Sequence, residues 1–381
     1  MSRMLRRGYY RPPTKLHACV AGSGTLLNEA TMGPHVIKLT GKSDPRHVTV
    51  VYLGTASYDI VEKRDKQTSW YSEQGCTVIA LDVVLNAPET SYMEECMQKA
   101  DIILVSGGNT NFAMRRWKHI GLDKMLKEAC LGPRRAVMAG GSAGAICWFS
   151  GGHSDSLDPD SFEEAKLHLH GGDSHHSSDI DEETDLHALA SEHYEDNVVH
   201  NWDYMRADGL GFIPGLCCPH HDRIQSNGVL RAIDFDKMLL RHPTEVGLCI
   251  DHNAAFVIEG DHFRVIYPEG FVGSVLPDET FSEERVGRPG VWLKEVVHDG
   301  TLVSARLCPE EGRLSDLLKL PVDIQQSTRH LKFAAEVNPD EGPLRMSYPG
   351  FSAKSFFGGK VTKEFTDFLA KMKEEEEGEH E

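Results

Sequence analysis

Short apolar runs alternate with amphipathic stretches along most of the chain, from about Leu16 to Ile266. The runs are His17–Ala21, Val48–Gly54, Cys76–Val83, Asp101–Gly107, Ala136–Gly140, Leu210–Cys218 and Gly247–Asp251. From Val48 onward they are rich in Val, Ile and Leu without polar alternation, which is typical of strands buried on both faces. Between them, helices are predicted at Ser91–Lys99, Phe112–Leu131 and Gly228–Arg241. This alternation favours an α/β fold, with a parallel sheet covered by helices on both faces.

Beyond this region the pattern predicts antiparallel hairpins and a last helix. The hairpins are Phe256–Glu259 with His262–Ile266, and Val291–His298 with Thr301–Leu307, and the helix is Lys363–Lys373. The chain is therefore divided into a basic N-terminus (1–15), an α/β domain (16–275), a β-rich extension (276–362) and a helix with an acidic tail (363–381). An acidic, histidine-rich insertion (156–200), predicted to be disordered, interrupts the α/β domain.

The composition narrows the class of protein. With 40% hydrophobic and 26% charged residues, the 381-residue chain is typical of a soluble globular protein. No run approaches 18 apolar residues, which excludes a membrane span, and a net charge of −18 disfavours nucleic acid and anionic membranes as partners. Nine cysteines without C-x-x-C spacing indicate reduced thiols, and hence a cytoplasmic protein. The basic start lacks a secretory apolar stretch, and an organelle-targeting segment remains the alternative to a frayed tail.

The negative charge is concentrated in two segments. Ser154–Asp196 holds 14 Asp and Glu against one Lys, and Lys371–Glu381 holds six Glu against two Lys. Together they account for 17 of the 18 net charges. The first segment also holds six histidines, which suggests a metal site as one alternative. Their spacing lacks the fixed pattern of a structural metal site, so a solvated loop is predicted, without metal or cofactor.

The most informative motif is Gly140-Gly141-Ser142-Ala143-Gly144, which follows an apolar strand and precedes a helix-compatible stretch. It satisfies G-x-S-x-G, whose small residues allow a sharp strand-to-helix turn with the serine at its tip. The amide of Ala143 could then face a forming oxyanion. A small-residue turn that packs a helix against a sheet is the alternative.

Two other strand ends carry candidate residues. Asp101–Gly107 ends in Gly107-Gly108-Asn109-Thr110, where the amides of Gly108 and Asn109 could supply a further oxyanion donor. A phosphate cradle is less favoured because G-x-x-x-x-G-K-[ST] is absent, and a capped turn is the structural alternative. The run Leu210–Cys218 ends in Pro219-His220, which offers an imidazole base for a serine hydroxyl.

These three turns, in this order and rough spacing, resemble the dipeptidase E family of aspartyl dipeptidases, with cyanophycinase as a relative. The family comprises serine peptidases with a flavodoxin-like, class I glutamine amidotransferase-like fold. The resemblance covers about Val48 to Ile266, apart from the acidic segment. It implies Ser142 as nucleophile, His220 as base, and the amides of Gly108 and Ala143 as the oxyanion hole.

The resemblance also implies an acid that orients His220 and a cation that binds the N-terminal aspartate of the substrate. Asp155 and Asp251 are the candidate acids, although His252 stands where some relatives have glutamate. The candidate substrate-binding residues are Asn109, Thr110, Arg223 and Arg231. The two arginines are the candidate cations, since Arg can bind a carboxylate bidentately.

The predicted function is a serine-type dipeptidase or exopeptidase that acts on small acidic peptides. Alternatives are a cyanophycinase-like or esterase-like serine hydrolase, and a catalytically silent binding or scaffold module. The oligomeric state is left open, with a homodimer among the alternatives. Because the acidic segment lies between Ser142 and His220 in the chain, we expect it to repel an acidic substrate at low salt.

Overall fold

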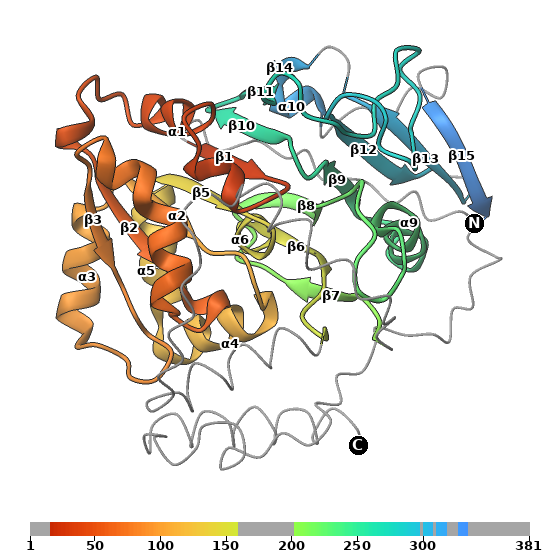
Figure 1. The fold of residues 1–381 in the computed structure, drawn as a ribbon. Helices are drawn as coiled ribbons and strands as arrows, with labels where there is room; N and C mark the ends of the chain where they lie inside the picture. The colour runs from red at the N-terminus through yellow and green to blue at the C-terminus, as the bar shows by residue number, and fades with distance from the viewer. Residues whose placement is uncertain (1–15, 159–201, 298–299, 308–309, 318–326, 334–381) are drawn as a thin grey trace, which may run out of the picture.

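The computed structural model describes residues 16–158, 202–297, 300–307, 310–317 and 327–333, and these form two β-sheets with helices around them (Figure 1). The first sheet has the strand order β14-β11-β10-β1-β5-β4-β2-β3. Its strands are β1 (His17–Ala21), β2 (Thr49–Leu53), β3 (Thr77–Ala80), β4 (Ile102–Val105), β5 (Val137–Gly141), β10 (Ala255–Glu259), β11 (His262–Ile266) and β14 (Glu311–Arg313).

Five of these strands form a parallel block, in the order β3-β2-β4-β5-β1. Within it, β3-β2-β4-β5 follows the 2-1-3-4 order of flavodoxin-like sheets, in which ligands bind at the carboxyl ends of the strands. The next position is occupied by the N-terminal strand β1, and antiparallel strands β10, β11 and β14 extend the sheet beyond it. The predicted α/β fold class is confirmed.

Helices cover both faces of this sheet. One face carries α1 (Gly33–Leu39) and α2 (Val61–Glu73), with the 3-10 helix η1 (Thr25–Asn28) packed beside them. The other face carries α3 (Thr90–Lys99), α4 (Thr110–Ile120) and α5 (Leu122–Leu131). Shorter 3-10 turns are η2 (Pro45–His47) and η3 (Thr55–Ser57). The central strands β1, β2, β4 and β5 are therefore buried on both faces, which explains their apolar runs.

The second sheet has the order β15-β13-β12-β9-β8-β6-β7. Its strands are β6 (Phe149–Ser154), β7 (Met205–Asp208), β8 (Ile213–Cys218), β9 (Val246–Ile250), β12 (Val291–Val296), β13 (Thr301–Arg306) and β15 (Ser327–Phe333). Helix α9 (Arg231–Arg241) packs on one face. The opposite face shares a single apolar core with the first sheet, so the two sheets are packed together.

The predicted strands and both hairpins are present at their expected places, but the sequence did not indicate two sheets. The predicted helix Phe112–Leu131 is divided into α4 and α5 at Gly121, whose φ is 77°. The stretch after the glycine-rich motif forms only the one-turn helix α6 (Ala143–Ile146) before β6 begins. A second short helix, α10, spans Leu314–Leu317.

Several predicted segments lie outside the described residues: the basic N-terminus, the acidic insertion beyond residue 158, and the last helix with its tail. In the described part, no helix is both long and apolar enough to span a bilayer. The eight cysteines within it are all buried and free.

Candidate active site

Ser142 lies in the turn between β5 and α6, at the carboxyl end of the parallel block. All residues of β5 and α6 are buried, whereas Ser142 is partly exposed. Its φ is 55° and its ψ is −125°, a conformation that residues with a side chain seldom adopt. Strain of this kind costs about 1–3 kcal/mol and concentrates at functional sites. The turn therefore has the geometry of a nucleophile elbow.

Two glycines make this turn sterically feasible. A Cβ on Gly141 would overlap the carbonyl oxygen of Ser23, and a Cβ on Gly144 would overlap that of Val105. Helix α6 can therefore pack directly against the ends of the neighbouring strands. It contacts β1, β4 and β5 of the first sheet and β6 and β8 of the second, and it lies between the two sheets in Figure 1. The elbow thus occupies their junction.

A second turn borders Ser142 at the end of β4. A Cβ placed on Gly107 would lie 3.9 Å from the Ser142 hydroxyl oxygen. The adjacent Gly108 is exposed, has a φ of 121°, and leaves no room for a Cβ beside the Ala56 carbonyl oxygen. The two predicted oxyanion donors, the amides of Gly108 and Ala143, therefore lie on the two backbone turns next to the serine.

Asn109 and Thr110, predicted to bind substrate, both have internal partners. Asn109 is buried, and its amide N–H donates to the Ala56 carbonyl at 2.7 Å, so this amide is not a free oxyanion donor. Its side chain caps α4 by accepting from the Phe112 N–H at 3.0 Å. Thr110 is fully buried, and its hydroxyl accepts from the Ser154 hydroxyl at 3.3 Å. In the structure, these two side chains hold the turn that presents Gly108.

His220 lies just beyond the end of β8, in a backbone conformation with φ 48°. The residue is partly exposed, and its Nδ1 lies 2.7 Å from Nδ1 of His252, which follows β9. The neighbouring His221 is fully buried and its Nδ1 lies 3.4 Å from Asp251 Oδ1. Of the two consecutive histidines, His220 is therefore the one that a substrate can reach.

The carboxyl end of β1 connects the serine turn with the loop that carries His252. The Ser142 N–H donates to the Ala21 carbonyl at 3.3 Å, and the Gly22 N–H donates to the Ala254 carbonyl at 2.9 Å. A Cβ on Gly22 would lie 2.9 Å from the Cα of His252. Ser142 of the first sheet and the loop of the second sheet that carries His252 therefore both border the carboxyl end of β1.

Neither predicted acid is bonded to His220. Asp251 is fully buried, where it accepts from the Ser274 N–H, the Ser274 hydroxyl and the Gly290 N–H at 2.7–3.0 Å. Burial raises its pKa to about 6, which these hydrogen bonds only partly offset. Asp155 instead accepts from Gln225 at 3.0 Å and from Arg231 at 3.2 Å. The described structure thus gives both carboxylates other partners.

The two predicted substrate-binding arginines differ in position. Arg231 is fully buried, and besides Asp155 its guanidinium donates to the His153 carbonyl at 2.6 Å. It therefore anchors the chain near Asp155 from inside the protein. Arg223 is partly buried, and its N–H donates to the His220 carbonyl at 2.9 Å, which places it beside the proposed base.

Two residues at the site were missed by the sequence analysis. Asp222 is buried, and its Oδ1 accepts from the His252 N–H at 2.7 Å. Its Oδ2 accepts from Arg285 at 2.8 Å. Asp222 directly follows the two histidines and could have been found from that position, but no local signal pointed to Arg285, because it lies far along the chain.

The electrostatics favour neutral imidazoles at this site. Burial, followed by the charges of Arg231, Arg223 and Arg285, holds the pKa of His220 well below its usual range. Burial and the neighbouring His220 likewise hold the pKa of His252 well below its usual range. A neutral His220 can accept a proton at physiological pH, as a general base must.

No three His, Cys, Asp or Glu side chains are grouped to hold a metal ion within the described residues. The histidine-rich segment that suggested a metal site in the sequence lies outside the described residues.

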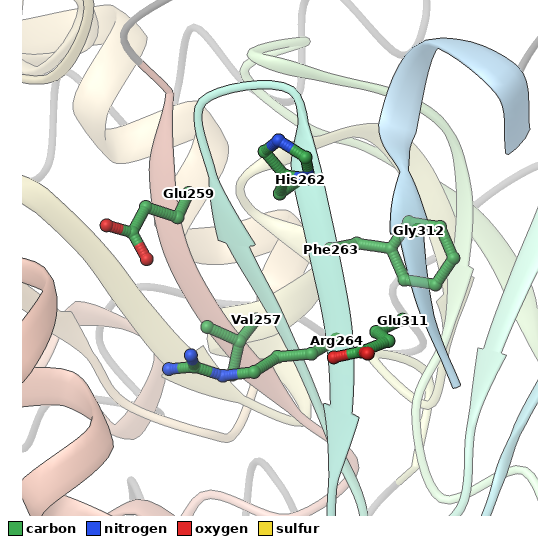
Figure 2. A pocket seen from close by; sticks show the side chains of 7 residues that line it. All are labelled: Val257, Glu259, His262, Phe263, Arg264, Glu311 and Gly312. Carbon is green, nitrogen blue, oxygen red and sulfur yellow. The ribbon is translucent and has the colours of Figure 1, made fainter. Parts of the chain in front are cut away.

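A separate cavity of about 420 Å³ opens over β10, β11 and β14 (Figure 2). In it, Arg264 extends across β10 past Val257, on the same side as Glu259. Val257 and Glu259 pair with the amino-terminal part of β1, whereas the site lies beyond Ala21 at its other end. The cavity is therefore distinct from the site around Ser142.

Residues 19–170 match the model of peptidase family S51. This segment contains the elbow and both proposed oxyanion amides, and it ends before His220. The match supports a peptidase.

Two curated relatives are similar to the chain. One is named G2/mitotic-specific cyclin-1, from Trypanosoma brucei brucei, and is 27% identical over 327 residues, 80% of this chain and 88% of that protein. The other is the uncharacterized peptidase YgaJ of Bacillus subtilis (strain 168), 33% identical over 129 residues, 34% of this chain and 53% of that protein.

Two solved structures are also similar. A protein described as peptidase E from Listeria monocytogenes EGD-e has a TM-score of 0.42 and 18% identity, covering 67% of this chain and 99% of that one. A peptidase from an acI-B1 Actinobacterium has a TM-score of 0.41 and 17% identity, covering 68% of this chain and 90% of that one.

Proposed function

We propose that this chain is a serine peptidase of family S51 that hydrolyses small peptides, preferentially those with an N-terminal aspartate. The observation that carries the proposal is Ser142 itself, which is partly exposed at the tip of a strained turn whose other residues are buried. A backbone conformation of this kind has no evident packing purpose for an exposed serine, whereas a nucleophile needs it to reach a substrate carbonyl.

The proposed reaction is acyl transfer to Ser142. Its Oγ attacks the scissile carbonyl carbon while the hydroxyl proton moves to Nε2 of His220. The carbonyl oxygen takes up negative charge and accepts hydrogen bonds from the Gly108 and Ala143 amides. The C–N bond then breaks as His220 returns the proton to the leaving amine. A water molecule, deprotonated by His220, finally hydrolyses the acyl-enzyme.

Specificity for aspartate requires a cation near the nucleophile. Arg223 is the best-placed candidate, because its backbone is bonded to His220 and, unlike Arg231, the residue is not fully buried. We expect Arg223→Ala to raise KM for Asp-Ala about 10-fold or more, since hydrogen bonds to charged groups contribute about 1.5–3 kcal/mol. KM for Ala-Ala should stay the same. Arg46→Ala, which changes an exposed arginine on η2, is the control.

The decisive experiment compares wild type with Ser142→Ala on a panel of Asp-X, isoaspartyl and neutral dipeptides. We expect wild type to cleave Asp-X dipeptides fastest and Ser142→Ala to lose at least about 10³-fold in kcat while remaining folded. Ser43→Ala, at an exposed serine outside the site, should retain full activity. Undiminished turnover by Ser142→Ala would overturn the assignment.

A catalytically silent binding module is the second candidate. It is favoured by the lack of a carboxylate bonded to His220 in the described structure, and by the non-peptidase name of one relative. A fluorophosphonate probe distinguishes the two, because it labels only an activated serine. Labelling of Ser142 supports the peptidase, and no labelling of a folded wild-type chain supports the binding module.

A further inference from the structure

The close contact between His220 and His252 restricts which ring nitrogens carry protons. Their Nδ1 atoms are 2.7 Å apart, so one must donate and the other must accept. Two protonated Nδ1 atoms at this distance would repel each other, and two unprotonated ones would leave the contact without a hydrogen. A single proton therefore lies between the rings.

The proposed reaction decides which histidine holds that proton. As a base, His220 must present an unprotonated nitrogen to Ser142, and Nδ1 already faces His252, so Nε2 is the nitrogen that remains. A neutral imidazole with unprotonated Nε2 carries its proton on Nδ1. His220 then donates from Nδ1 to an unprotonated Nδ1 of His252, which carries its own proton on Nε2.

The loop around His252 is firmly held. The His252 N–H donates to Asp222 Oδ1 at 2.7 Å, and Arg285 holds the other carboxylate oxygen at 2.8 Å. The preceding Asp251 is fixed by Ser274 and Gly290 through three hydrogen bonds. His252 is therefore positioned by its backbone, which leaves its ring to contact His220.

We infer that His252 is the third member of the catalytic group, a positioning residue that holds His220 in the tautomer and orientation of a base. This inference rests on the proposed function. In serine hydrolases with a Ser-His-Asp group, the buried carboxylate has the same task. Here Asp222 and Asp251, the neighbouring acids, bind backbone amides and other side chains, and the second imidazole makes the contact with the base.

An imidazole in this position has an electrostatic consequence. Unlike a carboxylate, neutral His252 adds no negative charge beside the imidazolium that forms during attack. The cations that act on His220 are Arg223 on its own loop, Arg231 on α9 and Arg285 before β12, and all three disfavour protonation. His220 should therefore remain unprotonated at pH values where an acid-paired histidine is already charged.

The test uses the full chain and three substitutions at residue 252, assayed on Asp-Ala over pH 4–9. His252→Ala should lower kcat about 10²-fold with KM within twofold, because a base that is free to rotate loses much of the roughly 10²–10⁴-fold contribution of general-base catalysis. His252→Gln should restore kcat to within 10-fold of wild type, since its amide oxygen can accept from Nδ1. His47→Ala, at an exposed histidine, is the matched control.

The pH profile of His252→Glu distinguishes a positioning role of residue 252 from a purely structural one. A carboxylate there should shift the acid limb of kcat/KM upward by about one pH unit or more, because it stabilises the charged imidazole. Wild-type turnover by His252→Ala would overturn the inference while leaving the peptidase assignment intact. The inference would also be overturned if His252→Gln does not restore the kcat lost in His252→Ala and the acid limb of kcat/KM is unchanged in His252→Glu.

Nitrogen NMR of histidine-labelled wild type tests the pair independently of activity. We expect one neutral ring protonated at Nδ1, assigned to His220 by comparison with His220→Ala, and one protonated at Nε2 for His252. The opposite assignment would overturn the inference even in an active enzyme. If wild type neither cleaves dipeptides nor labels with the fluorophosphonate, the proposed function fails, and the NMR spectrum still decides the arrangement of the pair.

Discussion

At the scale of single residues, the backbone of Ser142 has the most direct consequence. Its positive φ is a steric liability that glycine would remove, because glycine has no Cβ. The protein thus retains strain at the residue proposed to carry the chemistry. Strain kept at such a position is expected where function requires the conformation.

Substituting Ser142 in two ways should separate strain from chemistry. Ser142→Ala keeps the strained backbone, and Ser142→Gly relaxes it, so both should be inactive but unequally stable. We expect Ser142→Gly to be more stable than Ser142→Ala by about 1 kcal/mol, from strain relief of about 1–3 kcal/mol less the entropy of glycine. Chemical denaturation of both variants measures the difference, and equal stability would mean that the turn carries little strain.

Asp59 is a second residue with a measurable consequence. It lies between β2 and α2, where its Oδ2 accepts from the Val83 and Val84 N–H groups at 2.7 and 2.8 Å. Burial raises its pKa to about 7, since these bonds only partly offset the lost hydration. The folded protein therefore binds a proton that the unfolded chain releases near pH 4.

The sign of the resulting pH dependence is fixed. The stability that protonated Asp59 contributes is complete below its unfolded pKa and is lost as pH rises through about 7. Asn cannot ionise, so the stability of Asp59→Asn relative to wild type should improve from pH 4 to about pH 7 and then level off. Thermal unfolding at several pH values measures this, and a constant difference would show that Asp59 is not protonated in the folded state.

At the scale of elements, the one-turn helix α6 shows what local sequence could and could not predict. The glycine-rich motif correctly placed a strand-to-turn transition at Ser142, because the close backbone contacts of this turn require small residues. The apolar residues after it suggested a longer helix, since a buried helix and a buried strand have the same composition. The chain instead returns as β6, whose position is decided by pairing with β7 and β8.

Close packing of α6 predicts that Gly144→Ala is strongly destabilising. The added Cβ would overlap the Val105 carbonyl oxygen, which is backbone and cannot move aside without shifting β4. We expect a loss of about 2–3 kcal/mol from overpacking. Gly121→Ala is a matched control, because it meets no neighbour within 4 Å and suffers only from its φ of 77°, about 1 kcal/mol. Equal losses would contradict the packing argument.

At the scale of the whole molecule, the sequence predicted the fold class but not the assembly of the site. Ser142, His220 and the glycine turns followed from motifs at strand ends, where local residues carry the signal. The His220–His252 contact depends on which strands are neighbours, β8 and β9, and that pairing has no local signature. The acids Asp155 and Asp251 were reasonable by sequence position, but their partners come from distant loops.

The uneven charge also acts at this scale. The segment rich in Asp and Glu precedes His220 and follows Ser142 in the chain, and it should repel an acidic substrate at low ionic strength. Deleting Ser161–Asp196 should then lower KM for Asp-Ala at 10 mM salt, where the Debye length is about 30 Å, and have little effect at 1 M salt. An unchanged KM at low salt would mean that this charge acts at a distance from the substrate.

The proposed nucleophile comes from one sheet, and its base comes from the other. The shared apolar core, α6 and the contact of Gly22 with the His252 loop join the two sheets near these residues. Any slippage between the sheets would separate serine from histidine while leaving each sheet and its helices formed. Peptidase activity would then depend on how the two sheets pack against each other. It should be lost under mild pressure or denaturant before the circular dichroism of the backbone changes.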